Sequence, residues 1–200
     1  MTIQYITRKG SFDSAHRVMN ERVKCFNIHG HTYLYELTFS FEQMQPIGYA
    51  IDFKEIKRIG AAWIDEYLDH ASILNPKDAD FISAVHATRS KFRLMSLNRS
   101  GEYCNPTVEN IAKEIFLTME VLFSEWDSLK IHHVRLYETP NCFTDCNADS
   151  IHEEERNAFL SQRFEELKAY SQAMGRFEYD SRNIVTSDFT HEHLPSNKSR

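Results

Sequence analysis

The sequence predicts an α+β domain in which an antiparallel sheet packs against helices. Two strand-like segments come first, at residues 4–16 and 31–41, and a third lies at 130–140. Two amphipathic segments of helical character, at 50–68 and 105–126, lie between them. Strands followed by helices and then by a further strand are typical of an α+β domain. A chain of 200 residues is long enough for one well-filled core.

The strands are predicted from alternation of side chains. In 31–41, HTYLYELTFSF, aromatic and aliphatic residues occupy every second position, so this segment fits a half-buried strand. Segment 4–16 is rich in β-branched and aromatic residues and is expected to end near His16. In 130–140, Ile131, His133, Arg135 and Tyr137 are expected on one face, and His132, Val134, Leu136 and Glu138 on the other.

The helices are predicted from apolar periodicity and end signals. Asp52 is the expected N-cap of the first helix, and Pro106 stands near the first position of the second. Residues 77–104 are expected to hold a short helix and a short strand, KFRLMSL. We predict one domain over 1–150, with an insertion at about 77–103. Residues 151–200 form a C-terminal extension, first helical with a thin apolar stripe, then polar and disordered from Ser181.

Composition narrows the function classes. The net charge of −6 argues against a general nucleic-acid or anionic-membrane binder, although it leaves room for a local basic pocket. No apolar run approaches the length of a membrane span, and the N-terminus lacks the apolar core of a signal peptide. Four cysteines do not make a disulfide scaffold. We therefore expect a cytoplasmic protein with reduced thiols.

Three histidines stand in a pattern that suits a metal. His29 and His31 are two positions apart at the start of a strand, so their imidazoles share a face, and His16 ends the preceding strand. Three imidazoles can hold Zn²⁺ with one position open, as in catalytic zinc sites. Strand-end histidines without a ligand are the alternative. The proximity of His16 and of the upstream thiol favours the metal.

Other candidate residues have open interpretations. Cys25 could be a fourth zinc ligand, a buried cysteine or a catalytic thiolate, and its place in a loop disfavours burial. Cys142 and Cys146 form a weak alternative metal site, or two thiols without function. Adjacent Asp69 and His70 could be a catalytic pair or an ordinary helix end. Glu138, among apolar neighbours, could form a salt bridge or bind paired N–H donors of a ligand.

These residues resemble a known family. FDSAH, CFNIHGH, YAIDFKEIK, LDHASILN, NPTVENIA and RLYETP occur in the order found in 6-pyruvoyltetrahydropterin and 6-carboxytetrahydropterin synthases. The resemblance implies the tunnelling fold, in which two helices cover one face of an antiparallel sheet and the sheets of several subunits join into a barrel. It also implies a homohexamer of two trimers. The match covers residues 12–140.

The resemblance implies roles for nine residues. His16, His29 and His31 match the zinc ligands, and Cys25 matches the catalytic cysteine. Asp69 and His70 match the remaining catalytic residues, which the family presents across a subunit interface. Glu138 matches the carboxylate that binds the pterin edge, and Thr107 and Glu109 match positions near the pterin pocket.

The spacing CFNIHGH resembles the carboxy-type enzymes of 7-deazaguanine (queuosine) biosynthesis. They convert 7,8-dihydroneopterin triphosphate, and triphosphate and acetaldehyde are released. A pyruvoyl-type synthase and a non-catalytic zinc or pterin-binding module are the alternatives. Two features depart from the family: residues 77–103 are longer than in short members, and NCFTDCNADSI, where a fourth strand is expected, lacks a convincing strand pattern.

Overall fold

The computed structural model describes residues 2–45, 48–98, 104–127 and 129–175 and contains one six-stranded sheet, ordered β4-β3-β1-β2-β5-β6. The strands are β1 Gln4–His16, β2 His29–Phe41, β3 Ala71–Leu74, β4 Phe92–Leu94, β5 Leu129–Thr139 and β6 Cys142–Cys146. The helices are α1 Phe53–Ile56, α2 Ala62–Tyr67, α3 Ala79–Thr88, α4 Val108–Leu122 and α5 Glu153–Met174. A π-helical turn, Lys57–Ala61, joins α1 to α2, and a 3₁₀ turn, Ala148–Ser150, precedes α5.

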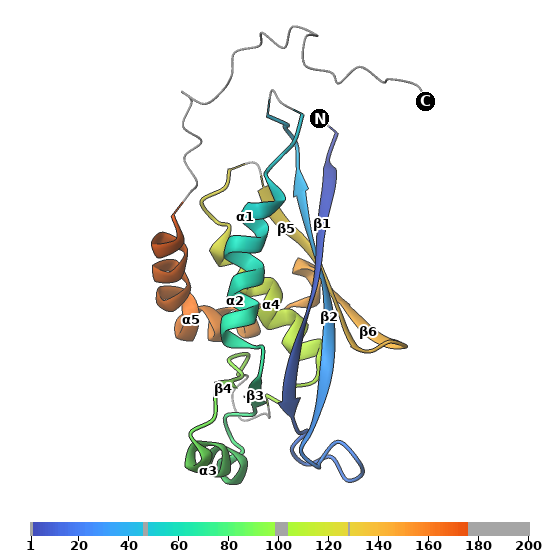
Figure 1. The fold of residues 1–200 in the computed structure, drawn as a ribbon, viewed down its shortest axis with the longest axis vertical. Helices are drawn as coiled ribbons and strands as arrows, with labels where there is room; N and C mark the ends of the chain where they lie inside the picture. Colours follow the sequence, from blue (N-terminus) through green and yellow to red (C-terminus); the bar gives the residue numbers. More distant parts are fainter. Residues whose placement is uncertain (1, 46–47, 99–103, 128, 176–200) are drawn as a thin grey trace, which may run out of the picture.

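The sheet is mixed. Strands β1, β2, β5 and β6 pair antiparallel, which confirms that part of the prediction. Strand β3 instead pairs parallel to β1, and β4 pairs parallel to β3. The helix formed by α1 and α2 runs alongside β1 in the same direction, so the chain enters β3 in that direction too (Figure 1).

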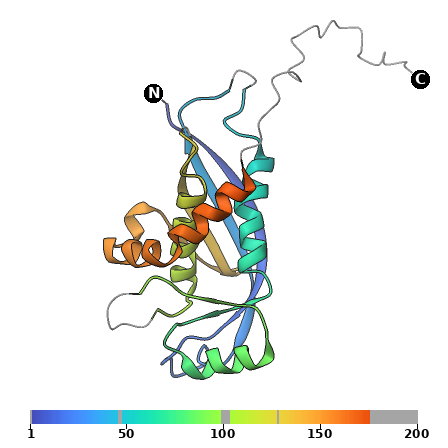
Figure 2. The same cartoon turned by 90° about the vertical axis from the view of Figure 1, so that its left-hand side faces the viewer.

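The helices cover one face of the sheet (Figure 1). The continuous helix α1–α2 and helix α4 pack against the sheet, and α5 packs on α4 (Figure 2). Asp52 caps α1 as predicted, because its carboxylate accepts from the Lys54 N–H at 2.8 Å. The side chains of Phe159 and Leu167 from α5 are fully buried in the same core as Tyr33, Phe39 and Phe116.

The fourth strand that the resemblance implies is present, whereas one sequence prediction about the strand before it was wrong. A β-bulge shifts the register between Thr38 and Phe39: Thr38 pairs with His133, whereas Phe39 pairs with Ile131. Because the bulge inserts one residue, Ile131 and Val134 both face the core, and the strict alternation predicted for 130–140 fails. NCFTDC, which lacks a convincing strand pattern, nevertheless forms β6, because β5 offers it a partner from Val134 to Thr139.

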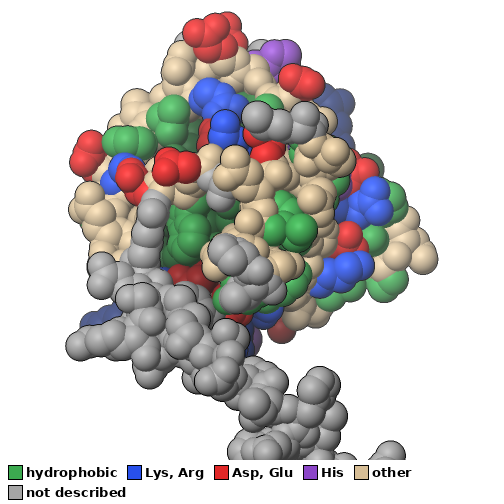
Figure 3. Space-filling view, turned by 90° about the horizontal axis from the view of Figure 1, so that it is seen from above, with side chains coloured by type: hydrophobic (Ala, Val, Ile, Leu, Met, Phe, Trp, Pro, Cys, Tyr) green, Lys and Arg blue, Asp and Glu red, His purple; other side chains and the backbone are tan. Residues whose placement is uncertain are grey.

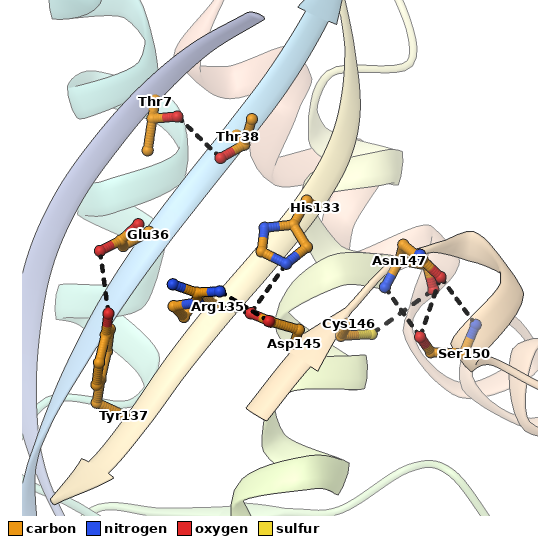
Figure 4. A network of polar contacts seen from close by, with 10 residues as sticks. All are labelled: Thr7, Glu36, Thr38, His133, Arg135, Tyr137, Asp145, Cys146, Asn147 and Ser150. Carbon is orange, nitrogen blue, oxygen red and sulfur yellow. Dashed lines mark hydrogen bonds and ion pairs between the residues drawn. The ribbon is translucent and has the colours of Figure 1, made fainter. Parts of the chain in front are cut away.

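Polar side chains form a network on the sheet face away from the helices (Figure 4). Thr7 and Thr38 share a hydrogen bond of 2.9 Å across β1 and β2. Between β5 and β6, Asp145 binds Arg135 at 2.7 and 2.8 Å and lies 3.0 Å from His133. Viewed along the long axis, basic and acidic side chains are interspersed rather than separated by sign (Figure 3).

The segments flanking the core match several expectations. Residues 77–98 contain the predicted short helix, α3, and a short strand, β4, which is shorter than KFRLMSL. The extension begins with the predicted helix, α5, while the polar segment from Ser181 lies outside the described residues. In the described part of the chain, no helix has the length and apolar character needed to cross a bilayer.

Candidate metal centre and catalytic residues

Three imidazoles meet at the end of β1 and the start of β2. The antiparallel register places His16 opposite His29, and His31 lies two residues further along β2 on the same face. One nitrogen of each ring lies within 4.8 Å of the others, and the ring centroids are 4.5 to 5.3 Å apart. His16 is buried and the other two are half-buried. These residues could hold one metal ion.

Backbone carbonyls fix the tautomers of two of these rings. His16 Nδ1 lies 2.7 Å from the Pro106 carbonyl, and His29 Nδ1 lies 2.7 Å from the Asn27 carbonyl. Because a carbonyl only accepts, each Nδ1 carries the proton and donates it. Each Nε2 therefore presents a lone pair, which is the arrangement that outer hydrogen bonds give to metal-binding histidines.

The environment keeps His16 neutral. Burial, with a smaller contribution from the neighbouring His29 and His31, lowers the pKa of His16 to about 4, although the hydrogen bond to the Pro106 carbonyl acts in the opposite direction. A neutral imidazole is the form that binds a metal. The Tyr33 hydroxyl lies 3.4 Å from His16 Nε2, and burial raises the pKa of Tyr33. His16 is therefore in the form that can bind a metal.

Glu138 lies beside the histidines. Its Oε1 is 3.7 Å from His16 Nε2 and 3.9 Å from His31 Nε2, and 27% of its side chain is exposed. The sequence left two interpretations of Glu138 open, a salt bridge or binding of paired N–H donors. The distances to the histidines add a third, because the carboxylate is also close enough to approach a metal bound by them. A ligand bound at the histidine cluster would contact the Glu138 carboxylate.

Asp69 and His70 do form a pair, but outside the histidine cluster. Asp69 Oδ2 lies 2.6 Å from His70 Nδ1, and its Oδ1 accepts from the Asp13 N–H at 2.7 Å. The Asp13 N–H and then His70 lower the pKa of Asp69, so this carboxylate stays ionised. The His70 side chain is 78% exposed. His70 lines a shallow surface depression that is also lined by His31 and Lys91.

The remaining candidates lie in the loop between β1 and β2 and at the start of α4. Cys25 is an exposed free thiol in the loop between β1 and β2, and among the described residues the metal-binding group contains the three histidines without it. Thr107 caps α4 by accepting from the Asn110 N–H at 3.4 Å, directly after Pro106. Glu109 is exposed in the first turn of α4.

Cys142 and Cys146 do not join a metal-binding group in the described part of the chain. Cys142 is exposed and Cys146 is buried on β6, and both are free. Burial raises the pKa of Cys146 to about 12, so this thiol stays protonated. The structure gives no support to a second metal site here.

The sequence did not reveal three groups that contribute to the candidate site. Tyr33 could have been found, because it lies two residues after His31 on the same strand face. The Pro106 carbonyl and the backbone of Asp13 could not, since their roles depend on contacts across 90 and 56 residues of chain.

The fold and the cluster define a tunnelling-fold protein with a site suited to a metal. A sequence model described as 6-pyruvoyl tetrahydropterin synthase matches residues 5–149. The chain belongs to this family. Its curled sheet resembles an uncharacterized protein from Wolinella succinogenes, with a TM-score of 0.59 at 20% identity, over 74% of this chain and 99% of that one.

Relatives carry a more particular name. A Rickettsia bellii protein named 6-carboxy-5,6,7,8-tetrahydropterin synthase is 33% identical over 143 residues, or 70% of this chain and 96% of the relative. A Rickettsia felis protein of the same name is 35% identical over 144 residues, with the same coverage. One from Haemophilus influenzae is 30% identical over 146 residues, again covering 70% of this chain and 96% of the relative.

Proposed function

We propose that this chain is a zinc-dependent carbon-carbon lyase that converts 7,8-dihydroneopterin triphosphate to 6-carboxy-5,6,7,8-tetrahydropterin. One water is consumed, and triphosphate and acetaldehyde are released. The ring is reduced at the expense of its own side chain, so no external reductant is needed. The proposal places the chain in the cytoplasm, in 7-deazaguanine biosynthesis. The observation that supports it most is the convergence of three histidine nitrogens beside the Glu138 carboxylate.

The donor set fits zinc. His16, His29 and His31 would hold the ion through nitrogen, and three protein ligands leave a position for substrate. Bound there, Zn²⁺ would act as a Lewis acid on the oxygens of the substrate side chain and make the adjacent C–H more acidic. The fixed Nδ1 protons of His16 and His29 keep the cluster ready for an ion without a change of tautomer.

The other residues would bind the substrate or move protons. Cys25 as thiolate would take the proton from the side-chain carbon, and His70, oriented by Asp69, would relay it. Glu138 would accept the two N–H groups of the 2-amino-4-oxopyrimidine edge. Thr107 and Glu109 would border the pterin pocket, and because Thr107 caps α4, it would act there mainly by fixing the backbone.

The protein would work as an oligomer, with homohexamers formed from two trimers. Open sheet edges are usually paired or covered in folded proteins. In the described residues, the edge strands β4 and β6 each pair with another strand on one side alone, which leaves their outer sides for neighbouring subunits. Residues 1–150 would form the synthase domain, with an insertion at 77–103, and residues 151–200 an extension.

Product identification tests the proposal. Purified protein is incubated with 7,8-dihydroneopterin triphosphate, and the products are separated and identified by mass spectrometry. We expect 6-carboxytetrahydropterin, acetaldehyde and triphosphate in equal amounts. A pyruvoyl product without acetaldehyde would favour the pyruvoyl-type synthase. Unchanged substrate with a fully metal-loaded protein would favour a non-catalytic module.

A further inference from the structure

Arg17 connects the loop that carries Cys25 to the helix α3. This loop, residues 17–28, leaves β1 directly after His16. Arg17 Nε donates to Asp78 Oδ2 at 2.6 Å, and Arg17 Nη2 donates to Asp78 Oδ1. The side chains of Arg17 and Asp78 are 16% and 3% exposed. A bidentate salt bridge of this kind fixes the orientation of the guanidinium as well as its distance from the carboxylate.

Asp78 is itself held firmly. It caps α3, because its Oδ1 accepts from the Phe81 N–H at 3.2 Å, and its own N–H donates to the Asn75 carbonyl at 3.0 Å. Hydrogen bonds from Arg17 lower the pKa of Asp78, which therefore stays ionised. The Arg17 guanidinium also lies 5.4 Å from the Phe81 ring centroid. Helix α3 thus offers Arg17 a rigid anchor.

Arg17 in turn holds the segment around Cys25. Its guanidinium carbon lies 5.0 Å from the ring centroid of Phe26, the residue after Cys25. The N–H of Val18, the residue after Arg17, donates to the Cys25 carbonyl at 2.7 Å. Two adjacent residues, Arg17 and Val18, therefore restrain the Cys25 segment: Val18 through the Cys25 carbonyl and Arg17 through the Phe26 ring.

We propose that the Arg17–Asp78 pair positions the Cys25 thiol, so that the segment 77–98 takes part in the active site through α3. The catalytic consequence rests on the function proposed above, whereas the mechanical consequence does not. Arg17 and Asp78 are positioning residues, since they act through the loop. Without the pair, Phe26 and the Val18–Cys25 contact lose their anchor, and the thiol samples more positions.

The experiment compares Arg17→Gln, Asp78→Asn and the double variant. Asparagine is a good N-cap, so Asp78→Asn removes the charge and keeps the start of α3. Hydrogen exchange is followed by mass spectrometry over residues 18–27, and turnover is measured per bound metal. Arg163→Gln is the matched control. Arg163 donates to the Leu94 carbonyl and the Ser96 hydroxyl, both at 2.7 Å, away from the loop.

We expect exchange over 18–27 to rise by about tenfold or more in both single variants, with β1 and β2 unchanged. Because small misplacements of a reacting group are costly, kcat should fall by roughly 10- to 100-fold, with KM unchanged. The double variant should be no worse than the poorer single variant, since both remove one interaction. Arg163→Gln should leave kcat and the exchange of 18–27 as in the wild type.

Three results would overturn the proposal. They are unchanged exchange over 18–27, faster exchange with unchanged kcat, or an equal loss of kcat in Arg163→Gln. If the wild-type protein does not turn over the pterin substrate, the proposed function fails separately. The exchange measurement then decides alone. Faster exchange confined to the loop supports positioning by the Arg17–Asp78 pair, and unchanged exchange refutes it.

Discussion

His16 and His29 lie directly opposite each other in the antiparallel pairing of β1 and β2, and their ring centroids are 4.5 Å apart. The register that places these rings together is the same register that buries Phe12 and Tyr33. A slip of one residue would turn the β2 side chains to the opposite face. The hydrophobic core therefore also enforces the geometry of the metal centre.

Loss of one imidazole should abolish metal binding. Protein purified without a histidine tag should contain about one Zn²⁺ per chain, and His31→Ala should contain almost none, because two imidazoles make too weak a site. Elemental analysis by mass spectrometry measures this. His86→Ala, which changes an exposed histidine of α3, is the control and should keep its metal. Equal metal content in the two variants would refute the cluster as the site.

Cys25→Ala should keep the metal and lose turnover. Removal of a general base typically costs about 10² to 10⁴ in rate. Zinc content and kcat are measured on the same preparation, with Cys142→Ala as the control, because Cys142 is also exposed. If Cys25 were a metal ligand, zinc content and melting temperature would fall together. Turnover near that of the wild type would exclude catalysis by this thiol.

Glu138→Gln should weaken pterin binding and leave the metal in place. One N–H of the pterin edge would face the amide N–H₂, and an unpaired buried group costs roughly 1–3 kcal/mol. Affinity should then fall about tenfold or more, measured by calorimetry. Glu154→Gln, at an exposed position of α5, is the control. Metal loss in Glu138→Gln would instead assign this carboxylate to the metal, as its 3.7 and 3.9 Å contacts allow.

The protein should be an oligomer, and light scattering should report a multiple of three chains.

His70 should contribute to the active site of a neighbouring subunit. To test this, Cys25→Ala and His70→Ala, each inactive alone, are mixed under conditions that exchange subunits. If each site takes Cys25 and His70 from different chains, about a quarter of the sites regain both under random mixing. If His70 serves its own chain, as the depression that it shares with His31 would permit, the mixture stays inactive.

Stability should depend on Glu114. Burial raises the pKa of Glu114 from 4.5 to about 7, although the Ser96 N–H, Arg93 and Arg163 oppose this shift. A raised folded-state pKa gives stability that is complete below pH 4.5 and lost as the pH rises to about 7. In the wild type, this lowers the free energy of unfolding by up to about 3 kcal/mol as the pH rises, since one pKa unit corresponds to about 1.4 kcal/mol. Glu114→Gln should remove this decrease.

Urea denaturation at pH 4.5 and 7.5 measures the effect of Glu114→Gln, with Glu154→Gln as the exposed control. Other groups also titrate in this range; His16, with its pKa lowered to about 4, acts with the opposite sign. The informative quantity is thus the difference between variant and wild type at the two pH values. The same difference at both values would show that Glu114 does not titrate as described.

The sequence alone determined the elements whose pattern is local. The alternation in β2, the periodicity of α4 and the cap at Asp52 depend on neighbours in the chain, so they could be recognised without a structure. The shared face of His29 and His31 follows from the same period of two. The motifs in order were sufficient to indicate the family that the sequence comparison shows.

Tertiary structure decided what depends on distant partners. The bulge at the Thr38–Phe39 register shift and the strand β6 depend on how neighbouring strands pair, and the local sequence does not show this. The Pro106 carbonyl reaches His16 across 90 residues, and Arg17 reaches Asp78 across 61. Such contacts result from packing the whole chain around one core, whereas a sequence pattern records only which side chains are available to be packed.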